Sequence, residues 1–315
     1  MSNYPSNFAK LILEICEEEA IRCVPLSDYW AFHLSRAKQS VSIYGYQFPI
    51  NQASAASICS DKSTASEILT KHSIPCVLHT CFMSPLYPDY LPARGNWVKI
   101  EELLLKHTAI VLKDNQGTGG DLVYQVKTQK EAEYASQIIF SKASTMAACP
   151  YYPIEEEYRV IVLNGQVKLI YSKLRPTLIG DGFSTILELL TKAISNNMLS
   201  PDALHYVREI DPSLVLEENA TLPLHWKHNL GQGASAHIVE NDTLFEALGA
   251  LALAAANCLS ISFASIDIIA TEQSYLILEV NSGVMMEHFS DENETHRTIA
   301  KEIYREAILA SFQPN

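Results

Sequence analysis

Two apolar runs near the C-terminus constrain this chain most, because together they predict a β-hairpin with acids on one face. The runs cover residues 265–269 and 276–281, and a short polar turn separates them. A hairpin centred on Gln273 pairs Asp267 with Glu279, six residues to either side. Asn281 lies two residues beyond Glu279 and therefore points to the same face, because side chains alternate along a strand. The other face is then wholly apolar, with Ile266, Ile268, Leu276, Leu278 and Val280.

The two paired carboxylates predict a divalent metal site. Directly opposed side chains have Cβ atoms about 5 Å apart, so Asp267 and Glu279 repel unless one is protonated or a cation lies between them. With Asn281 they supply only hard oxygen ligands, which suit Mg²⁺ or Mn²⁺ rather than zinc. The alternative at this point is a solvated hairpin face with incidental acids.

A glycine-rich loop follows the apolar run 109–113, and Lys113 ends that run. The loop reads Gln116-Gly117-Thr118-Gly119-Gly120. Glycines let backbone N–H groups approach a phosphate, and a flanking lysine adds a positive charge. The spacing matches neither GxxxxGK[ST] nor GxGxxG, so it does not indicate a phosphate-loop ATPase or a dinucleotide-binding fold. A simple turn is the alternative reading.

Several basic residues lie in the second half of the chain. Arg159 follows three glutamates, Arg175 precedes a proline, and Lys227-His228-Asn229 precedes Gly231. A transferring phosphoryl group needs cations around it, and the planar guanidinium of arginine suits a carboxylate. In so acidic a chain these residues are also compatible with ordinary surface ion pairs.

The remaining pattern predicts mixed α+β layers. Asn164-Gly165 between two apolar runs is a strong hairpin signal. Helices are expected to begin after Asp61 (or its neighbour Ser60), Thr128, Ser184 and Asp242, each of which is a favourable N-cap residue. Strands grouped as hairpins with helices alongside favour an α+β fold over a purely parallel sheet.

Composition sets broad limits on location and partners. A chain of 315 residues is long enough for two or three lobes, and its net charge of −13 argues against nucleic acid or an anionic membrane as partner. Residues 244–258, the most apolar helix-like stretch, are too few to cross a membrane. The seven cysteines show no CxxC spacing and no signal peptide precedes them, so a cytoplasmic protein is expected. The oligomeric state, homodimer included, is left open.

The ordered motifs resemble the ATP-grasp superfamily, and most closely the ATP-grasp domains of cyanophycin synthetase and of the bifunctional bacterial glutathione synthetase. The likeness covers roughly residues 45–310 and rests on five stretches. They are Asp61-Lys62; Val111-Leu112-Lys113 with the glycine loop; Glu157-Tyr158-Arg159-Val160; Arg175-Pro176 with Gly180-Asp181-Gly182 and residues 185–189; and Asp267-Ile268-Ile269 with Leu278-Glu279-Val280-Asn281-Ser282.

The resemblance implies two α+β lobes that grip ATP, behind a shortened N-terminal domain. The expected divisions are 1–60 for the N-terminal segment, 61–157 for the small lobe with the lid, and 158–315 for the large lobe with the metal and substrate site. Residues 283–286 differ from the Pro-Gly that often follows Glu-x-Asn in the family. The family builds much of its acceptor-substrate site from this segment and from the first domain, which is short here. No second catalytic domain is expected.

The resemblance also assigns roles to residues. It implies nucleotide contacts by Lys62, Lys113, Gly117, Thr118, Gly119, Gly120, Glu155 and Glu157, with residues 150–157 as the adenine hinge and Glu157 on the ribose. It implies that Arg175, Lys227 and Asn229 face the transferred phosphate, and that Asp267, Glu279 and Asn281 hold Mg²⁺ or Mn²⁺. The implied activity is ATP-dependent ligation of a carboxylate to an amine, on an amino acid or short peptide. A small-molecule kinase and a nucleotide-binding module without catalysis are the alternatives.

Overall fold

The computed structural model describes residues 5–84, 97–196, 198–199, 210–224 and 226–313. The chain forms two compact units, one of Met1–Ile170 with Val239–Asn315 and one of Tyr171–Ile238. Both contain helices and strands, and the predicted α+β class is confirmed. The predicted divisions at residues 60 and 157 stay predictions.

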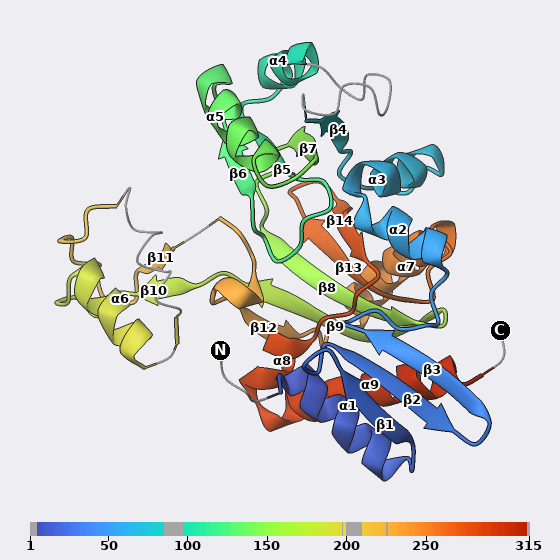
Figure 1. Cartoon of the computed structure of the whole chain (residues 1–315). Helices are drawn as coiled ribbons and strands as arrows, with labels where there is room; N and C mark the ends of the chain where they lie inside the picture. The colour runs from blue at the N-terminus through green and yellow to red at the C-terminus, as the bar shows by residue number, and fades with distance from the viewer. Residues whose placement is uncertain (1–4, 85–96, 197, 200–209, 225, 314–315) are drawn as a thin grey trace. The chain divides into compact units, whose positions relative to one another are not determined.

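The first unit holds most of the helices and strands (Figure 1). They are, in chain order, α1 (Asn7–Glu18), β1 (Arg22–Leu26), β2 (Ala31–Arg36), β3 (Gln39–Tyr44), α2 (Ala53–Ser60), α3 (Lys62–Lys71), β4 (Thr80–Met83), α4 (Trp97–Lys106), β5 (Ile110–Asp114), β6 (Val123–Val126), α5 (Gln129–Phe140), β7 (Thr145–Pro150), β8 (Glu156–Leu163), the start of β9 (Gln166–Leu174), α7 (Asp242–Cys258), β13 (Phe263–Ala270), β14 (Tyr275–Asn281), α8 (Glu287–Glu292) and α9 (Glu294–Ser311).

Two sheets of the first unit carry the residues of interest. In one, the order β4-β7-β5-β6 places β5 beside the glycine loop, and its apolar face packs on α4 and α5. In the other, β13 lies between β8 and β14 and is buried along its whole length. The face of this second sheet with Val160, Ile266 and Ile268 packs on α7. The opposite face is therefore where the polar side chains of these strands gather.

The N-terminal segment is joined to the C-terminal helices. Its sheet β1-β2-β3 lies with α1, α8 and α9, so the two ends of the chain build one layered region (Figure 1). Phe48 stacks on Tyr304 with ring centroids 5.8 Å apart. Glu14 and Glu18 of α1 form ion pairs with basic residues of α9. The short segment is thus held by packing and by charge.

The second unit is small. It consists of the end of β9, β10 (Thr177–Ile179), α6 (Ile186–Ser195), β11 (Thr221–Pro223), the 3-10 helix η2 (Leu230–Gln232) and β12 (Ser235–Ile238). β10 pairs with β11, and β12 pairs with the end of β9.

Two predicted helix caps are wrong by one residue. The N-cap of α6 is Thr185, whose hydroxyl accepts from Glu188 N, while Ser184 instead donates to the carboxylate of Asp181. The N-cap of α7 is Asn241, which leaves Asp242 in the first helical turn. The caps Asp61 and Thr128 and the turn at residues 164–165 are confirmed.

None of the helices in the described part of the chain is both long enough and apolar enough to cross a membrane.

Candidate functional site

The acidic end of the β13–β14 hairpin has the predicted register. Asp267 is the direct partner of Glu279, and Ser265 is the direct partner of Asn281. The Asn281 amide donates to Glu279 Oε1 at 3.2 Å, so the two side chains share one face. The sequence-based prediction that two acids and an amide gather here is confirmed as geometry.

Towards the turn, the predicted register is wrong by one residue. A β-bulge follows Asp267, and Ile268 pairs with Ile277 rather than with Leu278. Ile277 is 1% exposed and takes the core position, whereas Leu276 pairs with Ile269. Bulges depend on tertiary fit, since one extra residue re-aims the strand without changing the apolar pattern.

Arg159 adds a cation that the predicted metal site lacked. It stands on β8 directly opposite Asp267, so that Arg159, Asp267 and Glu279 form one row across three strands. Figure 1 shows the three strands, β8, β13 and β14, side by side. Its Nε and Nη2 donate to Asp267 Oδ1 and Oδ2, each at 2.7 Å. The Asp267 carboxylate is almost fully buried, and this two-point contact supplies the positive charge that a buried acid needs.

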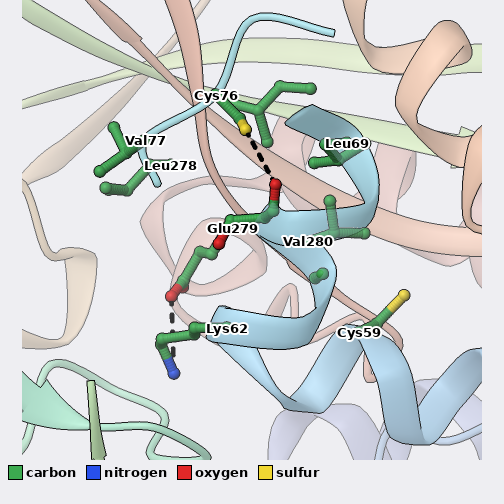
Figure 2. A pocket seen from close by; sticks show the side chains of 11 residues that line it. Cys59, Lys62, Leu69, Cys76, Val77, Leu278, Glu279 and Val280 are labelled. Atoms are coloured by element: carbon green, nitrogen blue, oxygen red, sulfur yellow. Dashed lines mark hydrogen bonds and ion pairs between the residues drawn. The ribbon is translucent and has the colours of Figure 1, made fainter. Parts of the chain in front are cut away.

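Lys62 lies over the other carboxylate. Asp61 caps α3, and Lys62, the first residue of the helix, approaches Glu279 of β14. The Lys62 ammonium is 3.8 Å from Glu279 Oε2 (Figure 2). It also donates to the carbonyl of Gly117 at 2.5 Å. Beneath this contact, α3 and β14 enclose a cavity of about 10 Å³, enough for one water molecule. One ammonium thus joins the glycine loop to the acidic hairpin.

Lys113 and His79 lie near Lys62. Burial lowers the pKa of Lys62, the carboxylate of Glu279 opposes this, and the positive charge of Lys113 lowers it further. Burial and the charges of both lysines hold the pKa of His79 well below its usual value, so its imidazole is neutral. Lys113 is 6% exposed and lies on the face of β5 opposite the core residues Ile110 and Leu112. Two buried cations beside a neutral ring suit an anionic ligand.

The glycine loop has the backbone that its sequence predicts. Gly119 and Gly120 have φ of +72° and +76°, a region that residues with a Cβ rarely adopt. The loop begins with Gln116 N donating to Asp114 Oδ1 at 3.0 Å. Gly117 follows, and its carbonyl receives the Lys62 ammonium. Backbone groups here are therefore held next to the two lysines.

The two predicted hinge glutamates lie in different surroundings. Glu157 is 7% exposed on β8, on the same face as Arg159. Glu155 is exposed and lines an open hollow of about 450 Å³ at the turn end of the hairpin, with Glu156 and Tyr275. We call Asp267, Glu279 and Asn281 the acidic row. The structure brings Glu157 towards the acidic row but not Glu155. Contacts of either residue with a nucleotide stay predictions.

Arg175, Lys227 and Asn229 all belong to the second unit. The Asn229 side chain accepts from Gly231 N at 2.9 Å and caps η2, and the Lys227 ammonium lies 5.8 Å from the Trp226 ring centroid. Between them, His228 is buried and bonded to the carbonyl of Lys173. Burial lowers the pKa of His228 to about 4, and the charge of nearby Arg175 contributes. The predicted contact of these residues with phosphate stays a prediction.

The acidic row fits Mg²⁺ or Mn²⁺ bound together with phosphate. In the part of the chain that the structure describes, no three His, Cys, Asp or Glu side chains cluster as a metal site. Mg²⁺ needs only one or two carboxylates, because waters and phosphate oxygens fill its other positions. A carboxylate oxygen carries two lone pairs, so the contact with Arg159 does not by itself prevent Asp267 from binding a metal ion. Asp267, Glu279 and Asn281 therefore remain suitable ligands.

Comparisons with known proteins bear on the fold of the chain. Residues 224–306 match the family model of the RimK-like ATP-grasp domain. The bifunctional glutathione synthetase from Pasteurella multocida is similar, with TM-score 0.60 and 14% sequence identity. The similarity covers 96% of this chain and 45% of the glutathione synthetase chain. The D-alanine–D-alanine ligase from Bacillus anthracis is similar, with TM-score 0.54 and 16% sequence identity, over 83% of this chain and 70% of the ligase chain. Its complex with ATP has TM-score 0.52, 14% identity and the same coverage.

No curated protein sequence matches this chain. The chain spans less than half the length of the glutathione synthetase, and identities this low show the fold alone. The predicted resemblance to the ATP-grasp superfamily is confirmed, including the likeness to glutathione synthetase, whereas the likeness to cyanophycin synthetase stays a prediction. The chain therefore has the ATP-grasp fold, and its residues 224–306 are similar to the RimK-like ATP-grasp domain.

Proposed function

We propose that this protein is an ATP-dependent ligase that joins a carboxylate to an amine through an acyl-phosphate. The observation that carries the proposal is the acidic row of β13–β14, where Asp267 and Glu279 are paired and Lys62 lies against Glu279. Such acids suit a divalent ion on nucleotide phosphates, and the two buried lysines suit the phosphates themselves. The ATP-grasp fold, shared with two proteins whose names are those of ligases, supports the reaction class.

In the proposed reaction, a substrate carboxylate oxygen attacks the γ-phosphorus, the bond from that phosphorus to the β-phosphate oxygen breaks, and ADP leaves. Lys62 and Lys113 offset the negative charge on the phosphates, and residues 117–120 offer backbone N–H groups and exclude water. Asp267, Glu279 and Asn281 would hold Mg²⁺, which when bound would polarise the phosphoryl group. An amine nitrogen then attacks the acyl carbon, phosphate leaves with its oxygen, and the amine proton passes to solvent.

The proposed substrates are amino acids or short peptides, and the proposed location is the cytoplasm. The support for the substrates is the similarity to a glutathione synthetase and a D-alanine–D-alanine ligase. Support for the location is the set of seven cysteines, all of them free thiols.

The test is ADP and phosphate release from Mg-ATP with a panel of amino acids and dipeptides, followed by mass measurement of the product. A ligase yields ADP, phosphate and an amide, whereas a kinase yields ADP and a stable phosphoester. Glu279→Gln should reduce turnover by at least about 100-fold, because a charged metal ligand is lost. Glu272→Gln is the matched control, since Glu272 is exposed in the turn of the same hairpin. Near-normal turnover of Glu279→Gln would remove the metal assignment.

A further inference from the structure

The segment that follows the acidic row is held by two amide side chains from the N-terminal segment. Asn281 ends β14, and the next residue, Ser282, is 2% exposed. Gln47 and Asn51, both in the connection between β3 and α2, contact Ser282. The connection lies more than 200 residues away along the chain, so these contacts are purely tertiary.

The Gln47 side chain forms hydrogen bonds with backbone donors and acceptors of the Ser282–Gly283 segment. In the amide orientation that pairs donors with acceptors, its nitrogen donates to Ser282 O at 3.2 Å. Its oxygen accepts from Gly283 N at 3.3 Å and from Ser282 Oγ at 3.0 Å. A Cβ on Gly283 would lie 3.2 Å from the Gln47 amide, so the backbone and this side chain are in close contact. Gln47 therefore fixes the position and the direction of the chain just after Asn281.

Asn51 closes the open end of the hairpin. Its Oδ1 accepts from Ser262 N and Phe263 N at 3.0 and 2.8 Å, and its Nδ2 donates to Phe263 O at 2.7 Å. The same Nδ2 lies 3.4 Å from Ser282 O. β13 begins at Phe263, and β14 ends one residue before Ser282. Asn51 thus links the two strands at the end where their own ladder stops.

We propose that Gln47 and Asn51 are positioning residues of the metal site. Neither touches the acidic row. Both fix Ser282, and through it the backbone of Asn281, whose amide faces Glu279. Side chains that hold a metal ligand in place control metal affinity even without touching the metal. The inference rests on the proposed function of the acidic row. It means that the short N-terminal segment helps to hold the metal ligands in place.

The test measures Mn²⁺ binding by electron paramagnetic resonance in the presence of a non-hydrolysable ATP analogue. Gln47→Met keeps the length and packing of the side chain and removes its three hydrogen bonds. We expect Mn²⁺ affinity to fall about 10-fold, the lower end for residues that support a metal ligand. Binding of the analogue in EDTA should be unchanged, since Lys62 and Lys113 are untouched. Gln52→Met is the control, because Gln52 is exposed and its side chain makes no cap hydrogen bond.

Gln47→Glu is a second variant, which keeps the oxygen that accepts from Gly283 N and should recover part of the affinity. The inference is overturned if Gln47→Met binds Mn²⁺ as the wild type does, or if its analogue binding in EDTA falls as much as its Mn²⁺ binding. Glu279→Gln separates the two proposals. If it abolishes Mn²⁺ binding and Gln47→Met has no effect, the metal assignment stands and only the positioning role fails. If Glu279→Gln leaves Mn²⁺ binding intact, both fail.

Discussion

Lys62→Met should change metal binding and nucleotide binding in opposite directions. The Lys62 ammonium is 3.8 Å from the Glu279 carboxylate, and two unit charges at that distance attract by roughly 4 kcal/mol at an effective dielectric constant of 20. Glu279 is 22% exposed, so solvent screening reduces this to about 1–2 kcal/mol. A metal ion that binds without nucleotide must overcome this contact and the repulsion from the ammonium.

We therefore expect Lys62→Met to tighten nucleotide-free Mn²⁺ binding by about 5- to 30-fold, which is the same free energy expressed as affinity. The same variant should weaken binding of the ATP analogue in EDTA, because a phosphate loses a cation. Methionine retains the apolar stem that packs between α3 and β14. The two titrations, Mn²⁺ alone and analogue alone, therefore separate a charge effect from a packing effect.

Lys71→Met is the matched control, since Lys71 ends the same helix and pairs at the surface with Glu67. It should leave both titrations unchanged. Unchanged or weaker Mn²⁺ binding in Lys62→Met would refute the view that Lys62 and the metal compete for Glu279.

Two further predictions concern stability. Arg159→Met should lower the free energy of unfolding by about 3 kcal/mol in urea titrations, because it leaves the buried Asp267 carboxylate without its cation, and a loss below about 1 kcal/mol would contradict this assignment. The pKa of His228 is lowered to about 4, so protonation favours the unfolded chain, and stability should be full above about pH 6.5 and fall as the pH drops towards 4. His228→Gln should flatten that part of the profile, and an equally steep profile in this variant would exclude His228 as its source.

Local signals in the sequence predicted the local parts of this structure. The β13–β14 register near Asp267 follows from the alternation of two strands joined by a short turn, and Asn164-Gly165 adopts the positive φ angles that its type of turn requires. The caps of α6 and α7 were missed because two adjacent residues in each case are good N-caps. The sequence alone does not decide between such neighbours, since the choice depends on what each side chain bonds instead.

The contacts that complete the site are not local, which is why they were not predictable. Arg159 meets Asp267 across 108 residues, and nothing in either segment indicates that β8 lies beside β13. Lys62 was expected to contact a nucleotide through the family resemblance, yet its bond to Gly117 O and its approach to Glu279 depend on how α3 packs on β14. Pairings between distant segments are set by the whole core rather than by any motif.

Each paired acid at the site has its own protein cation, and this bears on how the site works. Two carboxylates this close require compensation; Arg159 compensates Asp267 through a buried two-point contact, and Lys62 compensates Glu279 through a longer, partly exposed one. The first is costly to break and the second is not. In the proposed function, an incoming polyphosphate would attract the lysine and its metal would attract the freed carboxylate. We therefore expect Lys62 to be the group that exchanges partners, while Arg159 keeps Asp267 fixed.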